Sequence, residues 1–503
     1  MGIVFRQSAK NTLVSITGAM LGALVIWLST NYIPKRELGF IGNITNYAVI
    51  SSNILLLGLN ITMVVFVHRF ANDHAKKRVL LTMALAIPTA ITVVGAIVYN
   101  LMRGWIIKHF QPEDIPFMDR YFLWLPFFTL LFMYVLALEQ YLGSQFKVAI
   151  SAFMREVLLR VLNILLILLF AFGYIDFHIL VLGTILVYLV PVIIFFFLAA
   201  NTEGFGISFD FKVFSRSEYR EIAQFTWYHF LFVITALLIG MMDALLLPFY
   251  DHSGFASVAV FRVSVFFISF LMIPQKAMII ASFTVLAKAF ADNDMAKARD
   301  IFTRSSVNIF LATMLVAALL CCNLPEIMPV VRNDYAAVTP VFLILFLGNI
   351  VNIATGMNDQ VLSIANYYKF NFFLSLAVML ILFILLRALI PAYGIYGAAW
   401  GTTIAYLIFN VCKYTFVLKK LDMQPFTPGT LRIIAAGIAA FCAGYFLPHF
   451  FSGVANVYTR AAAEVLLRTT IITVVYSAMI LWLKPSEDVE TYIASIRKNK
   501  RLF

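Results

Sequence analysis

The chain consists largely of apolar segments, each about as long as a helix that crosses a lipid bilayer, which needs about 20 residues. Fourteen such segments follow one another: 9–32, 41–67, 80–102, 121–143, 150–172, 177–200, 222–249, 256–287, 303–324, 338–365, 371–390, 394–417, 431–448 and 461–483. Runs such as VLLRVLNILLILLFAF do not alternate between apolar and polar residues, as strands of a membrane barrel would. The segments therefore predict an all-α integral membrane protein with about 14 transmembrane helices.

The charge of the chain is explained by membrane topology rather than by a nucleic-acid partner. Only 12% of the residues are charged, whereas soluble domains have about 25%. The net charge of +12 comes from basic residues that lie mostly in short connections between the segments. The four cysteines lie in or at the ends of apolar runs and show no metal-ligand spacing, so neither a metal nor another cofactor is predicted.

Basic residues are distributed unevenly between the two sides of the predicted membrane. With the N-terminus inside and an even number of spans, the outer side receives only Lys35, Arg36, Arg103, Lys108, Arg120, Arg332, Arg387 and Arg460. Most other lysines and arginines fall on the cytoplasmic side, and this bias is typical of cytoplasmic loops. The sequence therefore predicts a multi-pass protein with both termini in the cytoplasm.

One polar connection occurs twice. RFANDHAKKR (residues 69–78) follows the second span, and AFADNDMAKAR (residues 289–299) follows the eighth. A second pair, GTILVYL (183–189) and GTTIAYL (401–407), has nearly the same offset of about 220 residues. Spans one to six thus correspond to spans seven to twelve. Because six is an even number, both copies start on the same side of the membrane, and they are predicted to be parallel repeats. Spans thirteen and fourteen are an addition.

The repeat predicts the organisation of the chain. We expect an N-terminal lobe at 1–200, a cytoplasmic interfacial linker at 201–221, a C-terminal lobe at 222–417, two extra helices within 431–483 and a cytoplasmic amphipathic tail at 484–503. The linker mixes phenylalanines with charged residues, and the tail has one apolar stripe, so both are expected at the membrane surface.

Two six-helix lobes, the stretch GIYGAAWGTTIAYLIF (394–409) and the 14-span count resemble the polysaccharide-flippase branch of the multidrug/oligosaccharidyl-lipid/polysaccharide exporter superfamily. The resemblance covers the whole chain. It implies a cavity between the lobes, lined largely by spans one, two, seven and eight, and a lipid tail accommodated with the help of spans thirteen and fourteen. It also implies a transporter rather than an enzyme.

Polar residues recur at helical spacing inside several spans, where they are expensive and usually face a cavity or a partner. Span two carries an amide stripe, and span eight carries a cationic stripe of Arg262, Ser269 and Lys276. The amide stripe consists of Asn43, Asn46, Asn53 and Asn60. Amides suit sugar hydroxyls, and Lys and Arg suit a diphosphate. Hydrogen bonding between helices, or snorkelling of Arg262, are the structural alternatives.

Charged residues elsewhere in the spans have two interpretations as well. Arg155 and Arg160, beside Glu139 and Glu156, form either an ion-pair cluster or a phosphate-recruiting gate. Asp243 and Asp359 are the acids best placed to couple transport to Na⁺ or H⁺, unless each pairs with a basic neighbour. No catalytic residue is predicted.

These features together predict a monomeric flippase in the bacterial cytoplasmic (inner) membrane. Its substrate would be a polyprenyl-diphosphate-linked oligosaccharide for polysaccharide biosynthesis, and its partners membrane lipids and a polysaccharide polymerase or glycosyltransferases. A lipid II flippase is the first alternative and a cation-coupled multidrug antiporter the second. A membrane glycosyltransferase is disfavoured, because the outer connections are short.

Overall fold

The computed structural model describes residues 2–70, 73–144, 148–202, 204–331 and 335–491, with the side chains of 2–16, 148 and 149 left aside. Predictions that concern Ala71, Asn72, Lys147, Arg332 or the tail beyond residue 491 lie outside this part of the chain. So do those that concern the side chains of Arg6 and Lys10. All regular secondary structure in the described residues is helical, and the predicted all-α class is confirmed.

Each of the fourteen predicted spans falls on helix. Seven of them correspond to α1 (Gly2–Tyr32), α4 (His74–Leu101), α7 (Trp124–Ser144), α12 (Arg216–Tyr250), α15 (Met295–Val331), α19 (Pro428–Tyr445) and α20 (Val457–Leu483). Within the described residues, nine stretches of helix are long and apolar enough to cross a membrane, and two bent pairs pass the same test. The bent pairs are α2 (Lys35–Leu55) with α3 (Leu59–Arg69), and α16 (Val338–Ala354) with α17 (Asn358–Ile364).

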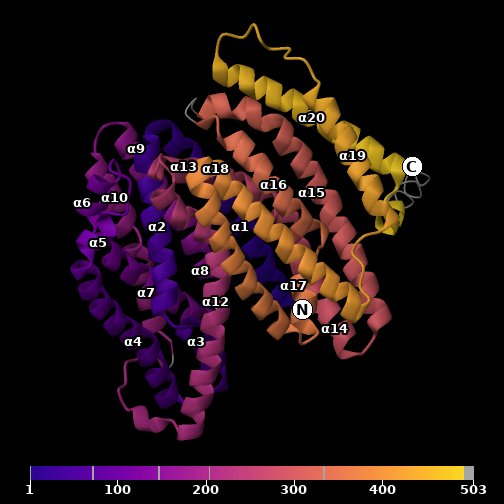
Figure 1. Ribbon diagram of the computed structural model, residues 1–503. Helices are drawn as coiled ribbons and strands as arrows, with labels where there is room; N and C mark the ends of the chain where they lie inside the picture. The colour runs from indigo at the N-terminus through magenta and orange to yellow at the C-terminus, as the bar shows by residue number, and fades with distance from the viewer. Residues whose placement is uncertain (1, 71–72, 145–147, 203, 332–334, 492–503) are drawn as a thin grey trace. The chain divides into compact units, whose positions relative to one another are not determined.

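The remaining spans are interrupted or merged. Span five consists of α8 (Val148–Phe153), the π-helix η1 (Met154–Leu158) and α9 (Leu159–Ala171), and span six of α10 (Phe177–Leu186) and α11 (Leu189–Ala200). Span eight consists of α13 (Phe255–Leu271) and α14 (Ile273–Ala291), and α18 (Tyr368–Leu421) contains spans eleven and twelve. Short helices lie in the connections: α5 (Arg103–Ile107), α6 (Ile115–Tyr121) and the 3₁₀ helix η2 (Phe211–Val213). Figure 1 shows their order along the chain.

The glycine-rich stretch 394–409 forms the turn between spans eleven and twelve. Gly394 has φ 56° and ψ −134°, a conformation that L side chains rarely adopt, and it reverses the chain inside α18. A Cβ on Gly397 would overlap the carbonyl oxygen of Leu389, so the two arms of the turn meet backbone to backbone. Two glycines are therefore required for this tight connection between helices.

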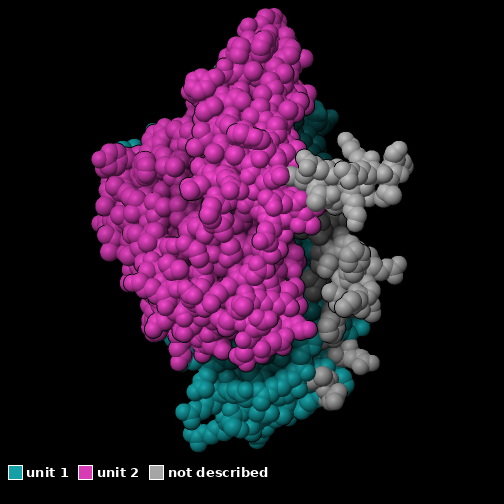
Figure 2. Space-filling view, turned by 90° about the vertical axis from the view of Figure 1, so that its right-hand side faces the viewer, with its two compact units in different colours: residues 1–259 teal, residues 260–503 magenta. Residues whose placement is uncertain are grey.

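The chain divides into two compact units, residues 1–259 and 260–503, which Figure 2 shows in different colours. In unit 1, α2, α3 and α11 pack on α7, α1 packs on α9, and α12 packs along α2 and α3. Its buried core includes Met63, Phe66, Leu138 and Tyr141. The division falls within α13, near its start, whereas the sequence repeat divides in the linker before α12. The two-lobe repeat itself stays a prediction.

Unit 2 is built around α15, which packs on α14, α16, α19 and α20, and around the pairing of α16 with α18. Its buried cluster joins Phe310, Ile433, Ala436 and Ile472. The predicted tail begins here with a helical turn at 487–491, where the Oγ of Ser486 accepts the Val489 N–H at 3.3 Å. Ser486 thus acts as the predicted cap.

Candidate substrate-binding site

The cationic residues of span eight lie on one exposed face of α13 and α14. Arg262, Ser269 and Lys276 are exposed, while Phe261, Ser264, Leu271 and Gln275 on the other side of these helices are buried. Among the described residues, no carboxylate lies within ion-pair distance of Lys276, in contrast to most basic residues in the spans. The predicted stripe is therefore an exposed cationic face on which the Lys276 ammonium is open to an anion.

Gln275 explains why Lys276 points outward. The Gln275 side chain is buried, and its Nε2 donates to the Gly356 carbonyl at 3.0 Å. Gly356 has φ 69° and lies at the bend between α16 and α17, where backbone carbonyls lose their helical partners. The Gln275 side chain, next to Pro274, thus satisfies a carbonyl at the bend of span ten. The following residue, Lys276, lies about 100° further round α14 and is exposed.

The amide stripe of span two does not follow one straight helix. The chain bends by 47° between α2 and α3, at Gly58 with φ 83°, so the heptad spacing from Asn53 to Asn60 does not keep one face. Asn43 and Asn60 are buried inside unit 1, while Asn46 and Asn53 are half-buried. The prediction of one continuous stripe is wrong, because periodicity alone does not detect the bend at Leu56–Gly58. The side chains of Asn46 and Asn53 remain partly accessible to a ligand.

Arg155 and Arg160 belong to an ion-pair cluster. Arg155 pairs with Glu139 at 2.6 Å and with Glu156 at 3.3 Å, and Arg160 pairs with Glu156 at 2.7 Å and donates to the Gly18 carbonyl of α1. The π-helical turn at Met154–Leu158 brings both arginines round Glu156. Their charges are thus used inside unit 1, which favours the structural interpretation over a phosphate-recruiting gate.

The two candidate coupling acids have different surroundings. Asp243 is buried in α12, and its Oδ1 accepts the Ala244 N–H at 2.7 Å. Asp359 lies in α17, where the Lys413 ammonium contacts both carboxylate oxygens at 2.9 and 3.0 Å. The Lys413 side chain is only 2% exposed, against 48% for that of Asp359. Lys413 also lies 3.7 Å from the ring centroid of Phe409. A built-in cation therefore accompanies Asp359.

Sequence reasoning placed Lys413 among the cytoplasmic topology residues and missed this pairing. Its position within the apolar run of α18, well before Lys419 and Lys420 in the last turn, was the available signal. Its partner lies 54 residues away on a bent helix, so the sequence gives no indication of the contact.

A second missed cluster lies in unit 1 at the predicted outer side. Asp114, between α5 and α6, is fully buried and accepts the Phe255 N–H at 2.8 Å, with the Arg36 guanidinium at 3.4 Å. Burial raises the pKa of Asp114 to about 6, and the Phe255 N–H and Arg36 lower it only in part. A Cβ on Gly39 would overlap the Phe255 carbonyl oxygen. The turn after α12 is thus held tightly on α2 and the α5–α6 connection.

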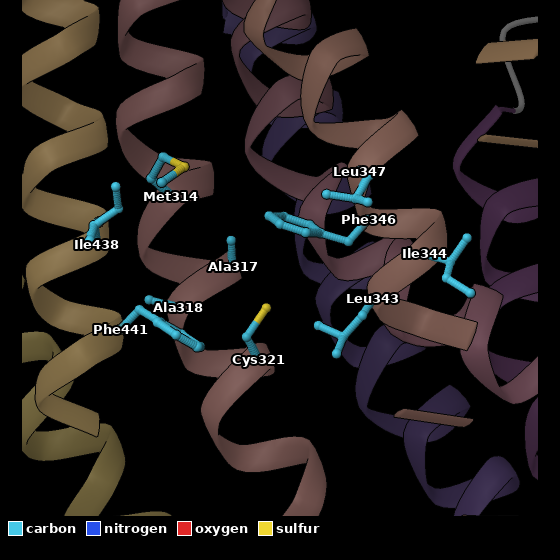
Figure 3. Close-up of a pocket in the computed structure, with 11 residues that line it drawn as sticks. Met314, Ala317, Ala318, Cys321, Leu343, Ile344, Phe346, Leu347, Ile438 and Phe441 are labelled. Atoms are coloured by element: carbon cyan, nitrogen blue, oxygen red, sulfur yellow. The ribbon is translucent and has the colours of Figure 1, made fainter. Parts of the chain in front are cut away.

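Unit 2 contains an apolar pocket of about 390 Å³ between α15, α16 and α19. Figure 3 shows Met314 and Cys321 of α15 facing Leu343, Phe346 and Leu347 of α16, with Ile438 and Phe441 of α19 on the other side. α19 is the first of the two added spans. Its Gly437 leaves room beside Met314, so the pocket exists partly because a glycine replaces a side chain there.

The fold is shared with known transporters. No family model matches the sequence, and no curated protein does. Among solved structures, a lipid II flippase, MurJ, in an inward closed conformation matches with a TM-score of 0.74 and 15% identity over 93% of this chain and 97% of its own. An inward-facing multidrug resistance MATE family transporter of the MOP superfamily matches with a TM-score of 0.63 and 15% identity, covering 80% of this chain and 94% of its own. The MATE multidrug transporter DinF-BH in complex with R6G matches with a TM-score of 0.56 and 16% identity, over 83% of this chain and 95% of its own.

These similarities define the class of fold: a multi-helix membrane fold found in flippases and multidrug transporters. The match covers almost the whole length of the two multidrug transporters. It leaves a larger part of this chain unmatched than the match with the lipid II flippase does.

Proposed function

We propose that this chain is an alternating-access flippase that moves a polyprenyl-diphosphate-linked oligosaccharide from the inner to the outer leaflet of the bacterial cytoplasmic membrane. The observation that carries the proposal is the exposed cationic face of α13 and α14. Lys276 has no carboxylate partner among the described residues, and Arg262 lies on the same face. A diphosphate supplies the two or more negative charges that such a face would bind.

The sugar and the lipid tail would use other surfaces. Ser269 lies between the two cationic residues, and Asn46 and Asn53 in unit 1 are half-buried, so hydroxyl and amide groups are available to sugar hydroxyls. The 390 Å³ pocket between α15, α16 and α19 would take part of the isoprenoid tail, because its lining is apolar. Both termini are proposed to lie in the cytoplasm, with a polysaccharide polymerase or glycosyltransferases as partners of the monomer.

Coupling to Na⁺ or H⁺ is proposed to involve Asp243, with Asp359 as the second acid. The Asp359 carboxylate already has the Lys413 ammonium beside it, so binding of a further cation there would require Lys413 to move away. Asp243 is buried in α12, and Asp243→Asn is expected to remove the ion dependence of transport while leaving binding intact. An unchanged response to both gradients would exclude Asp243.

The first alternative, a lipid II flippase, is favoured by the extent of the fold match with MurJ. Its substrate would also present a diphosphate to Lys276, so the cationic face does not separate the two. The second alternative, a cation-coupled multidrug antiporter, is disfavoured by the cationic face, because a site for cationic drugs needs acids and aromatic rings.

A binding experiment with purified full-length protein tests the proposal. A fluorescent polyprenyl-diphosphate oligosaccharide, lipid II and a cationic dye would be titrated in turn. We expect the oligosaccharide lipid to bind most tightly and Lys276→Ala to weaken it roughly tenfold or more, the cost of losing one charge-assisted hydrogen bond. Lys288→Ala, on the same helix three turns away, serves as the matched control. Preference for lipid II would establish the first alternative, and preference for the dye would refute a flippase.

A further inference from the structure

Unit 1 contains a larger apolar groove that is distinct from the cationic face and from the pocket of unit 2. It has a volume of about 890 Å³ and is bounded by α4, α7, α11 and the linker that follows α11. Leu85 and Ala86 of α4 line one wall, Val192 and Phe196 of α11 the opposite one, and Ile207 and Phe209 of the linker close one end. Phe209 and Ile207 are exposed, so the groove opens at the surface of the protein.

The hydroxyl groups in the groove are already satisfied by the protein. Thr89 donates to the Leu85 carbonyl at 2.6 Å and is hydrogen-bonded to the Tyr134 hydroxyl at 2.8 Å. Thr82 donates to the Arg78 carbonyl at 2.7 Å and accepts the Ser208 N–H at 2.8 Å. These side chains therefore offer little to a polar ligand, and the groove presents a surface suited to a hydrocarbon chain.

Basic residues lie at the linker end of the groove. Arg78 is one helical turn before Thr82, and His74 is one turn before Arg78; both are exposed. The linker passes directly over them: a Cβ on Gly206 would lie 3.3 Å from the Arg78 Nε. Among the described residues, no carboxylate pairs with Arg78. The end of the groove is thus electropositive where the membrane interface would lie.

The length of the groove matches one leaflet. The residues of α4 that line the groove, Thr82 to Ala90, span about 12 Å at 1.5 Å per residue, and with Arg78 one turn further the site extends over about 18 Å. One leaflet contributes about 15 Å of hydrocarbon to a bilayer core of about 30 Å. A polyprenyl tail is much longer than this, whereas a phospholipid acyl chain spans a single leaflet.

We propose that this groove is a binding site for one anionic phospholipid, with an acyl chain between α4, α7 and α11 and the phosphate at Arg78 and His74. The leaflet is the one on the linker side, which the predicted topology makes the cytoplasmic leaflet. Ile207 and Phe209 contact the chain, so the bound lipid also holds the linker on α4. This site is independent of the proposed transport substrate.

The test uses full-length protein, stripped of lipid in detergent and titrated with dioleoyl phosphatidylglycerol or dioleoyl phosphatidylcholine, with bound lipid counted by native mass spectrometry. We expect the first phosphatidylglycerol molecule to bind more tightly than any further phosphatidylglycerol molecules. It should also bind more tightly than phosphatidylcholine. Arg78→Gln should weaken phosphatidylglycerol binding roughly tenfold and remove most of the headgroup preference, because a charge-assisted hydrogen bond is lost. Ala86→Trp, which fills the groove, should abolish the tight site for both lipids.

Two control variants keep the test specific. Val94→Trp places the same ring on an exposed part of α4 that does not line the groove, and Lys108→Gln removes a base from the predicted opposite side. Both should bind like the wild type, and thermal unfolding should confirm that every variant is folded. Wild-type binding by Ala86→Trp, or equal affinity for the two lipids, would overturn the proposal. Tighter binding of a polyprenyl phosphate than of phosphatidylglycerol at this site would also overturn it.

Discussion

The buried ion pair in unit 2 should respond very differently to the removal of its two partners. The Lys413 side chain is 2% exposed and that of Asp359 is 48% exposed. Asp359→Asn leaves an ammonium group buried without its counter-charge, and breaking a buried pair in this way costs about 3–5 kcal/mol. The Asn carbonyl and the Phe409 ring still contact Lys413, so we expect a loss near the lower limit, about 3 kcal/mol.

Lys413→Met should cost much less. The Asp359 carboxylate that remains is half exposed and can be hydrated, and the Met side chain keeps most of the packing, so a loss of about 1 kcal/mol or less is expected. The double variant Asp359→Asn with Lys413→Met should be close to Lys413→Met alone. The difference between the double variant and the sum of the single variants, a coupling of about 3 kcal/mol, measures the interaction.

Unfolding in mixed micelles, titrated with a denaturing detergent and followed by circular dichroism, gives these free energies. Asp422→Asn removes the partner of Arg299 in an exposed pair at 3.2 Å and serves as the control, with an expected loss below about 1 kcal/mol. Equal losses for Asp359→Asn and Lys413→Met would refute the reasoning, as would strict additivity in the double variant.

Three other sites allow predictions of the same kind. Because the pKa of Asp114 is raised to about 6 from 3.8, its contribution to stability is present below about pH 4 and is lost as the pH rises through 6, by up to about 3 kcal/mol. Thermal unfolding measured against pH should show this loss, and Asp114→Asn should remove the pH dependence. Gly39→Ala should lower the melting temperature through a loss of about 1–3 kcal/mol, since its Cβ meets the Phe255 carbonyl; an unchanged temperature would contradict the close contact. Gln275→Leu leaves the Gly356 carbonyl without its partner and should cost about 1–3 kcal/mol in detergent unfolding, whereas a neutral effect would show that water replaces it.

The number and nature of the spans could be predicted because membrane helices must be long, apolar and internally hydrogen-bonded. The bends could not. Leu57 and Gly58 interrupt span two, and Gly356 interrupts span ten. In the sequence, Gly58 and Gly356 do not differ from the many other glycines in apolar runs. The turn at Gly394 lies in a glycine-rich stretch, and the structure shows that its non-helical backbone separates the helices of spans eleven and twelve.

The candidate site was predictable to the extent that its residues lie within one span. Arg262, Ser269 and Lys276 recur at steps of seven and are all exposed, and Met272 between α13 and α14 keeps a right-handed helical conformation. The amide stripe failed because it crosses the bend after Leu55. Contacts between distant segments, such as Lys413 with Asp359 and Asp114 with Phe255, depend on packing that no local pattern contains.

The most direct test of the proposed function is translocation in vesicles. Full-length protein is reconstituted with a fluorescent polyprenyl-diphosphate oligosaccharide, and the fraction of substrate accessible to a membrane-impermeant quencher is followed over time. The wild type and Lys288→Ala should equilibrate the substrate between leaflets, and Lys276→Ala should not, although it remains folded. Equal translocation by Lys276→Ala and the wild type would contradict the role given to the cationic face of α13 and α14.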